Sequence, residues 1–481
     1  HGLFCAPYRV KEGRISISEA QPVDLEGATA RDIRRATECS VFVTTNEGRL
    51  FELFTRDGAM PRVREIPLES PSGTDRGMVG MPVYTESGNL VVPYSHGGVD
   101  TYQPQGDGFV CTDTFFQKVP VFSILATEQE MVWIGTDGMG VLKTYYDAKQ
   151  FHLIGPMSQA SDGNLSGGIV RCFYLDGETL YVGMKGDGLI RIEHFDTPKL
   201  RRMQPIAVEN NHIFSLAKGF GEELLVGTDA RGLGIYDLKS GRMQMLRGAD
   251  PAETFASIYA IYADPAGGRI WLGTSGYGLV ELQVSYSNGE YRLQRVGKYM
   301  MDKTDPRAIS SNIVYSIVRE GDYLWLATRG GGLCRFSLSD RRFDSWQYEP
   351  DEASSISNND LLSLTVDAVH NLWIGTSYGL NCLSLDHLER GFRSYTSRDG
   401  LPNNTVHGIV ATGEQLWLST NKGLSMLDVT TGEFCNFYRS DGLQSDEFSD
   451  GAYLLSADSS YVFMGGVKGL NYFSPHEISR R

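Results

Sequence analysis

The sequence lacks a hydrophobic run of about 18 residues, so no segment of the chain is predicted to span a bilayer. It also lacks an excess of basic residues, because 44 Lys and Arg stand against 59 Asp and Glu and leave a net charge of −15. Nucleic acids and anionic membrane surfaces are bound through basic patches. We therefore expect this chain to contact no nucleic acid.

Spacings typical of metal, cofactor and nucleophile sites are missing as well. The seven cysteines never form Cys-x-x-Cys, and the nine histidines never form His-x-x-x-His or His-Glu-x-x-His. A phosphate-binding Walker pattern and a dinucleotide-binding strand–glycine–helix pattern are also absent. The sequence thus predicts no metal, no cofactor and no catalytic residue.

What the chain has instead is a repeat, seen in the stretch "WIGTSYGL" at residues 373–380. A large apolar residue followed by a short Gly/Thr-rich segment recurs ten times, at intervals of 42 to 54 residues. The residues of this aromatic column are Phe42, Val91, Trp133, Tyr181, Leu225, Trp271, Trp325, Trp373, Trp417 and Phe463. A period near this length with four strands per repeat predicts an all-β protein of the β-propeller class.

Each repeat divides into four expected strands, A to D. In one repeat these are 258–262, 270–274, 278–282 and 291–296. A position that accepts Trp, Tyr, Phe, Leu or Val is expected to be a packing position. The glycines around the B–C turn let that turn tighten near the ring centre. "WIGTSYGL" is therefore interpreted as scaffold, with no bound phosphate.

Counting strands suggests how the rings close. The last repeat has no strand D after residues 469–473, whereas residues 151–154 precede the first complete C-terminal repeat and match the D strands at 343–346, 392–395 and 434–437. We therefore expect residues 149–477 to form a seven-bladed propeller closed by strand 151–154. Residues 1–148 are expected to be the C-terminal part, about three blades, of a first, truncated propeller. The alternative is one ring of ten blades, above the usual four to eight.

The loops before strand A carry a second signature, at 305–314, 355–359 and 399–406. Together with "LWIGT-x-x-GL", this pattern resembles the two-component-regulator propeller found in the periplasmic sensor region of hybrid histidine kinases of gut Bacteroidetes. The resemblance implies an extracytoplasmic domain that binds a glycan-derived oligosaccharide and signals to a downstream kinase. It also implies a homodimer, tethered to the inner membrane through a downstream segment, in which this chain itself is not an enzyme.

Two sets of residues are candidates for ligand binding. The second residue of strand A is mixed and includes Arg171, Tyr315 and His407, whereas the residue after it is always small. The B–C turns and D–A loops emerge on one face, where His212, Tyr277, Asn312, Arg329, Asn359 and Tyr378 are expected to supply stacking surfaces and hydrogen bonds. A propeller-fold polysaccharide or lactone-type lyase, and a pure interaction scaffold, remain alternatives because propellers host all three functions.

Overall fold

The computed structural model describes residues 2–11, 14–54, 60–68, 77–85, 87–106, 108–116, 119–127, 131–145, 151–155, 165, 168–198, 200–246, 256–264, 266–287 and 290–478. The chain divides into two compact units, His1–Ala148 and Lys149–Arg481. The residues around the boundary expected from the sequence, 146–150, lie outside the described part. Apart from two 3-10 turns, Leu388–Arg390 and Arg439–Asp441, the described secondary structure is β.

The first unit holds fifteen strands among its described residues: β1 (Leu3–Cys5), β2 (Tyr8–Lys11), β3 (Arg14–Ile17), β4 (Gln21–Val23), β5 (Ala30–Arg35), β6 (Ser40–Thr45), β7 (Leu50–Phe54), β8 (Arg62–Ile66), β9 (Val83–Tyr84), β10 (Leu90–Tyr94), β11 (Gly98–Gln105), β12 (Gly108–Phe115), β13 (Val121–Thr127), β14 (Met131–Thr136) and β15 (Val141–Tyr145). Strands β5–β8 and β9–β12 form four-stranded sheets, and β13–β15 form a three-stranded sheet. Two smaller pairs, β1–β4 and β2–β3, precede them.

In the second unit, consecutive sets of four antiparallel strands form sheets that we number as blades I to VI. They are blade I, β17 (Ile169–Asp176), β18 (Thr179–Lys185), β19 (Gly188–Glu193) and β20 (Arg202–Ile206); blade II, β21 (Ile213–Lys218), β22 (Glu223–Thr228), β23 (Leu233–Asp237) and β24 (Met243–Leu246); blade III, β25 (Ile258–Asp264), β26 (Arg269–Thr274), β27 (Leu279–Ser287) and β28 (Glu290–Tyr299); blade IV, β29 (Val314–Glu320), β30 (Tyr323–Thr328), β31 (Gly332–Ser337) and β32 (Phe343–Trp346); blade V, β33 (Leu361–Val366), β34 (Asn371–Thr376), β35 (Gly379–Ser384) and β36 (Phe392–Tyr395); and blade VI, β37 (Val406–Thr412), β38 (Gln415–Thr420), β39 (Gly423–Asp428) and β40 (Phe434–Phe437).

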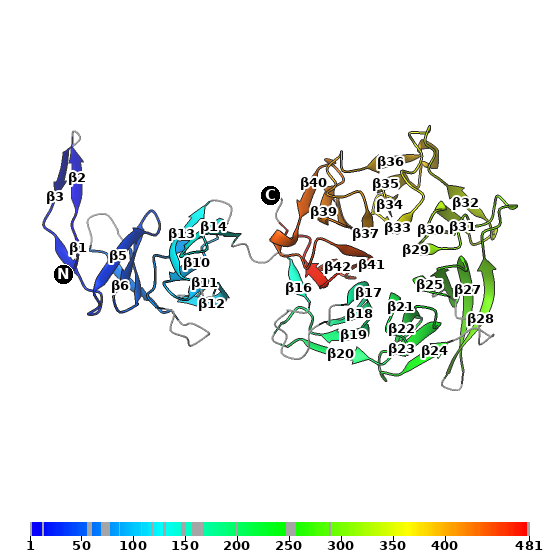
Figure 1. Ribbon diagram of the computed structural model, residues 1–481, viewed down its shortest axis with the longest axis horizontal. Helices are drawn as coiled ribbons and strands as arrows, with labels where there is room; N and C mark the ends of the chain where they lie inside the picture. Colours follow the sequence, from blue (N-terminus) through cyan, green and yellow to red (C-terminus); the bar gives the residue numbers. More distant parts are fainter. Residues whose placement is uncertain are drawn as a thin grey trace. The chain divides into compact units, whose positions relative to one another are not determined.

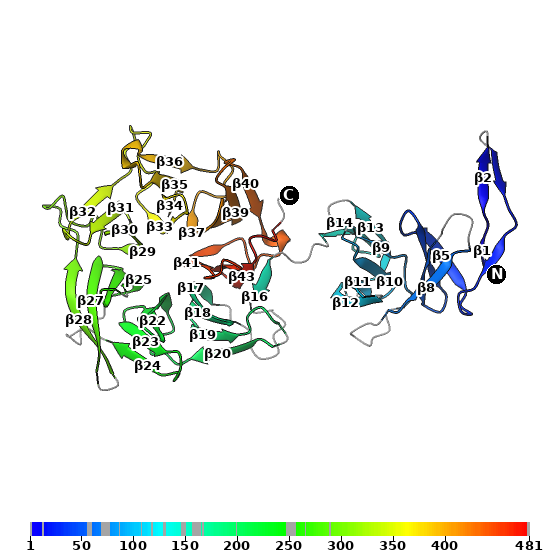
Figure 2. The ribbon, with the colours of Figure 1, turned by 180° about the vertical axis from the view of Figure 1, so that it is seen from behind.

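Blade VII combines both ends of this unit. Strands β41 (Phe448–Leu455), β42 (Val462–Gly466) and β43 (Gly469–Phe473) come from its end, and β16 (His152–Ile154) comes from its beginning and pairs with β43. Figures 1 and 2 show the blades arranged radially, with the first strand of each at the centre. Neighbouring inner strands contact each other all the way round, including β41 and β17. The second unit is therefore a closed ring, and the predicted all-β propeller class is confirmed.

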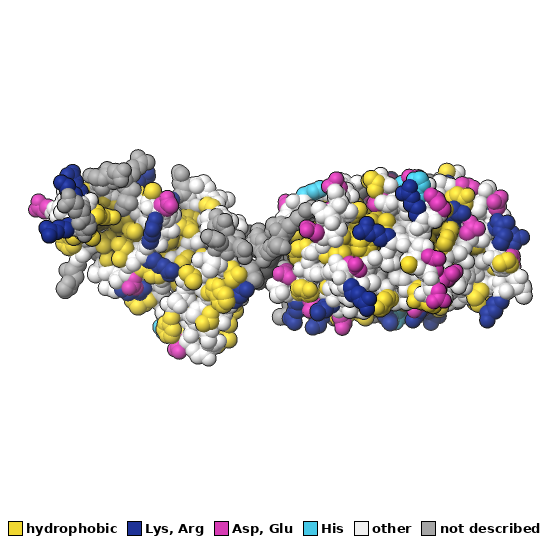
Figure 3. All heavy atoms as spheres, turned by 90° about the horizontal axis from the view of Figure 1, so that it is seen from above, with side chains coloured by type: hydrophobic (Ala, Val, Ile, Leu, Met, Phe, Trp, Pro, Cys, Tyr) yellow, Lys and Arg dark blue, Asp and Glu magenta, His cyan; other side chains and the backbone are white. Residues whose placement is uncertain are grey.

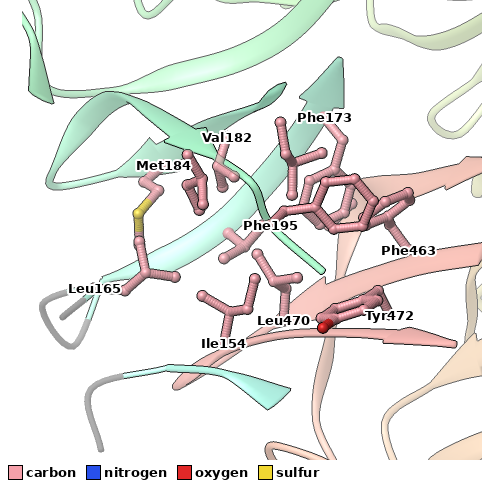
Figure 4. Close-up of a cluster of buried hydrophobic side chains, with 13 residues drawn as sticks. Ile154, Leu165, Phe173, Val182, Met184, Phe195, Phe463, Leu470 and Tyr472 are labelled. Carbon is pink, nitrogen blue, oxygen red and sulfur yellow. The ribbon is translucent and has the colours of Figure 1, made fainter. Parts of the chain in front are cut away.

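The core of the ring lies between blades rather than inside them. Trp373 of blade V packs with Val406, Ile409 and Leu418 of blade VI, and Trp271 of blade III packs with residues of blade IV in the same way. At the closure, Phe463 of blade VII packs into a cluster with side chains of blade I (Figure 4). Each aromatic-column residue thus stabilises the contact with the next blade of the ring.

The B–C turns explain why the repeat ends strand B with Thr and opens strand C with Gly. The Thr376 hydroxyl donates to the Gly379 carbonyl at 2.9 Å, and Thr420 donates to Gly423 at 2.8 Å. Gly379 has a positive φ of 112°, which favours glycine. At Gly375, a Cβ would approach the Val406 carbonyl oxygen of the next blade to 2.6 Å. Glycine in "WIGTSYGL" therefore serves a tight turn and a close approach between blades.

Candidate functional site

The inner strand of each of blades I to VI carries a β-bulge at the same place. The register shifts by one residue there, and the extra residue is the second of the strand in blades II to VI and the third in blade I. These bulge residues are Arg171, Phe214, Tyr259, Tyr315, Leu362 and His407. A bulge leaves its residue outside the ladder and redirects its side chain. Side chains from adjacent blades consequently meet at the ring centre, and we call this set, with Ser449 and Asp450 of blade VII, the inner rim.

One part of the inner rim is polar. His407 Nδ1 lies 2.5 Å from Asp450 Oδ1, and His407 Nε2 lies 2.7 Å from Oδ1 of Asn421, a B–C turn residue of blade VI. Arg171 donates to the Ser449 hydroxyl at 3.3 Å, and its Nη1 lies 3.9 Å from Asp450 Oδ2. Blades VI, VII and I are thereby joined across the point where the ring closes.

Another part of the inner rim is aromatic. The Phe214 and Tyr259 rings lie 5.3 Å apart, and the Tyr259 and Tyr315 rings 4.7 Å apart. The Arg171 guanidinium lies over the Phe214 ring at 5.2 Å and connects the aromatic to the polar part. Arg329, from the B–C turn of blade IV, donates to the Tyr315 hydroxyl at 3.1 Å. The site therefore offers stacking surfaces beside charged hydrogen-bonding groups.

The electrostatics of the inner rim keep Asp450 ionised. Burial alone would raise the pKa of this carboxyl, but the hydrogen bond from His407 and the charges of Arg171 and Arg329 outweigh burial and leave the pKa below its usual value. Burial, with nearby Tyr259, raises the pKa of Tyr315 despite the Arg329 charge, so its hydroxyl stays protonated. The Nε of Arg171 is buried without a hydrogen-bond partner.

Two of the predicted loop residues have structural roles. The side-chain oxygens of Asn312 and Asn359 accept the backbone N–H groups of Met301 and Tyr348, each at 2.7 Å. Their own carbonyls accept N–H groups from the B–C turns of the preceding blades. These asparagines therefore join the D–A loop to the neighbouring turn, which explains their recurrence.

The remaining predicted residues occupy separate turns of the same ring. The Tyr378 ring is exposed on the B–C turn of blade V. The Tyr277 ring in blade III carries the Lys298 ammonium group 4.1 Å from its centroid. His212 directly precedes β21 of blade II, and its Nδ1 is buried without a hydrogen-bond partner. The structure thus brings Arg171, Tyr315, His407 and Arg329 to one place and leaves these three residues on loops around it.

The residues that the sequence did not point to are Asp450, Ser449 and Asn421. Strand β41 departs from the common bulge, because Phe448 and Tyr453 are five positions apart whereas their partners, Gly466 and Met464, are two positions apart. The extra residues carry Asp450 into the inner rim and remove it from the repeat alignment. The signal in the sequence was the longer spacing between the start of strand A and the aromatic-column residue in the last repeat. Extra residues in an inner strand can direct a side chain out of the β-ladder.

A cavity of about 320 Å³ lies on the predicted face, between the B–C turn of blade I and the loop that leads to blade II. Asp187, Gly188, Asn210 and Asn211 line it together with the segment 205–208. The Asp187 Oδ2 atom is buried there without a hydrogen-bond partner. The volume of this cavity is at the lower end of the range for sites that bind small molecules.

Among the described residues, no group of three or more potential metal ligands occurs, and no helix has the length and hydropathy of a membrane span.

Comparison with a family model places part of the chain in a known repeat. Residues 253–276, which include strands β25 and β26, match the two component regulator propeller. The resemblance predicted from the repeat is thereby confirmed.

Proteins similar to this chain have low sequence identity to it. Histidine kinase P4 of Formosa agariphila is 21% identical over 317 residues, which are 56% of this chain and 23% of that protein. The extracellular domain of a protein named as the hybrid two component system BT3049 of B. thetaiotaomicron superposes with a TM-score of 0.66 and 19% identity, covering 96% of this chain and 59% of the other. The extracellular domain of BT4673 from the same organism gives a TM-score of 0.54 and 18% identity, with 99% and 62% covered. The chain therefore spans less than two thirds of each of these relatives.

Proposed function

Because the chain carries a two component regulator propeller repeat, we propose that it is the extracytoplasmic ligand-sensing region of a sensor histidine kinase and that its ligand is an oligosaccharide. The relatives support the first part, since one is named a histidine kinase and two are extracellular domains of signalling systems. Periplasmic location, attachment to the inner membrane by a downstream segment and homodimerisation of the ectodomain belong to the same proposal.

The observation that carries the ligand class is the composition of the inner rim. A sugar ring has apolar C–H faces and a hydroxyl periphery, so it is bound by aromatic faces beside fork-like hydrogen-bonding groups. Tyr259 and Tyr315 supply such faces, and Arg171 and Arg329 supply the donors. Tyr378 and the cavity beside Asp187 extend the same face outward.

Thermal unfolding of the intact chain against a panel of oligosaccharides tests this proposal. At least one glycan should raise the melting temperature in a concentration-dependent way, because a ligand bound only by the folded state stabilises it, by about 2.7 kcal/mol at a hundredfold excess over Kd. A panel covering plant, host and microbial glycans that produces no shift contradicts the oligosaccharide proposal.

Variants locate the site. Arg171→Gln, and the double change Arg329→Ala with Tyr378→Ala, should abolish the glycan-induced shift. The double change should move the unliganded melting temperature little, whereas Arg171→Gln should lower it because the contacts with Ser449 and Asp450 are lost. His370→Ala is the matched control, because His370 lies in the A–B turn of blade V, where it contacts Asp386 at 2.7 Å. Its glycan response should equal that of the unmodified chain. Normal binding by the Arg171 and Arg329 variants would place the ligand away from the inner rim.

A lyase is the second candidate, and the pair formed by His407 and Asp450 is what favours it. An imidazole oriented by a carboxylate, with the Arg171 guanidinium close by, can abstract a proton beside a carboxylate or ester group if a substrate displaces Asn421 from Nε2, which then takes the proton. Prolonged incubation with the glycans should nevertheless leave them intact if the chain is a sensor. Cleavage that is lost in His407→Gln would favour the lyase.

A further inference from the structure

Two arginines at the inner rim have no close carboxylate partner. The Nη1 atom of Arg171 lies 3.9 Å from Asp450 Oδ2, whereas Arg335 of blade IV lies 2.7 Å from its carboxylate partner. Among the described residues, Arg329 forms no ion pair, and its guanidinium donates to the Tyr315 hydroxyl. The centre of the ring therefore holds two guanidinium groups whose charges are not closely paired.

The carboxylate of the inner rim is already engaged. Asp450 Oδ1 is bound by His407, and its Oδ2 faces Arg171. Asp360, at the end of the loop before blade V, acts electrostatically on Arg329 but lies beyond ion-pair distance. Two guanidinium groups against one carboxylate leave an excess of positive charge at the ring centre, although the net charge of the whole chain is −15.

The turns on the two faces of the ring differ in charge. The segments between strands A and B contain no Lys or Arg, and their acidic residues are Glu178, Glu222, Asp322, Asp367, Glu414 and Asp458. The charged residues of the B–C turns, on the opposite face, are Asp187, Asp229, Arg231, Arg329, Lys422 and Lys468. The D–A loops carry charges of both signs. In the edge-on view of Figure 3, Lys and Arg side chains gather along one margin of the ring. The B–C turns around the inner rim thus favour the approach of an anion.

The aromatic part of the inner rim lies directly beside one of these charges. The Tyr259 and Tyr315 rings are 4.7 Å apart, and the exposed Arg329 contacts the Tyr315 hydroxyl. A sugar ring that rests on this tyrosine pair therefore brings its substituents close to Arg329. A guanidinium group presents parallel N–H donors, which match the oxygens of a carboxylate or of another oxyanion.

We propose that the oligosaccharide bound at the inner rim is acidic, and that a carboxylate or sulfate group on one of its sugars is held by Arg329 and Arg171. This inference rests on the proposed function and narrows its ligand class. Hydrogen bonds between charged groups are about twice as strong as those between neutral groups. The acidic group therefore supplies most of the selectivity, and the tyrosine pair supplies the stacking surface.

Matched pairs of probes test the inference. One set pairs oligouronates with the neutral chains obtained by reducing their carboxyl groups, and the other pairs sulfated oligosaccharides with their desulfated forms. Isothermal titration of the intact chain should show an acidic member that binds at least about tenfold more tightly than its neutral counterpart, as for hydrogen bonds to a charged group. Its affinity should also fall as salt is added, because salt screens exposed charges. The two sets distinguish carboxylate from sulfate.

Variants separate a specific contact from the net charge of the chain. Arg329→Gln should lower the affinity for the acidic probe by at least about tenfold and change that for the neutral probe little. Arg329→Lys should recover part of the loss, because it keeps the charge but not the paired donors. Arg390→Gln is the matched control, since Arg390 is exposed in the 3-10 turn between strands C and D of blade V, on the opposite face. Its affinity for the acidic probe should equal that of the unmodified chain.

Three results would overturn the inference. Equal affinities within every pair would show that the acidic group is not recognised. Equal weakening by Arg329→Gln and Arg390→Gln would show that only net charge matters. Binding confined to neutral glycans would refute an acidic ligand and leave the oligosaccharide proposal standing, whereas no binding by any member of either set or of the wider glycan panel contradicts both.

Discussion

Trp133 and Trp373 occupy the same position of the same repeat, yet one is partly exposed and the other is buried. The difference does not lie in their own blades, which have the same A–B–C order of strands. It lies in the neighbouring blade, since Trp373 has blade VI against it and Trp133 has no described blade on that side. An apolar column in a repeat protein thus indicates an interface between neighbouring repeats, and the stabilisation that it gives depends on both repeats of the pair.

The largest effect expected from this comparison concerns the two tryptophans. Trp373→Ala should destabilise residues 149–481 by about 3–5 kcal/mol, the usual cost of emptying a large aromatic site in a core. Trp133→Ala should cost the first unit about 1 kcal/mol or less, because solvent already reaches that ring. Urea unfolding, followed by the fluorescence of the five tryptophans in the second unit and by circular dichroism, measures both. Similar losses would show that the column does not depend on its neighbour.

The isoleucines that face the preceding blade give the next largest contrast. Ile409→Ala should cost about 2–5 kcal/mol, as for other buried isoleucines, whereas Ile33→Ala should stay within about 0.5 kcal/mol, as for other exposed positions. The same unfolding experiment applies. A substantial loss at Ile33 would mean that another part of the chain covers β5.

The polar part of the inner rim exists only because the ring closes, and it should make the ring sensitive to acid. The pKa of Asp450 is lowered in the folded state, so its contribution is fully present above the ordinary carboxyl pKa of about 3.9 and is lost as the pH falls through the lower, folded value. Asp450→Asn should cost about 1.5–3 kcal/mol at neutral pH, as for hydrogen bonds to a charged group. The difference from the unmodified chain should shrink below about pH 4. Melting temperatures over this pH range test the sign, and a difference that grows in acid would contradict it.

The smallest contrast is between loop residues whose side chains stabilise a turn and loop residues whose side chains do not. Asn359→Ala removes the acceptor of the Tyr348 N–H and should cost about 0.5–1.5 kcal/mol. Tyr378→Ala changes an exposed ring and should stay within about 0.5 kcal/mol, while weakening glycan binding. Equal glycan affinity in both variants and the unmodified chain would remove Tyr378 from the site.

Much of the fold could be predicted from the sequence because its determinants are local. The alternation of strands A to D, the Thr376 bond to Gly379 and the recurrent Asn359 contact all join residues within about one repeat, so each copy carries the same signal. The column of Arg171, Tyr315 and His407 could be noticed for the same reason. The role of that column could not be predicted, because a β-bulge is recognised only from how a strand pairs with its partner strand.

The sequence by itself determined the propeller class, the four-stranded repeat and the turns, because each depends on contacts between residues close in the chain. Only the tertiary structure decided which copy of the tryptophan column is buried and which residues meet at the centre of the ring. His407 and Asp450 are 43 residues apart, and Arg171 and Ser449 are 278 apart. These pairs come together because seven inner strands converge on one axis, and an irregular strand β41 brings in the carboxylate that the repeat does not predict.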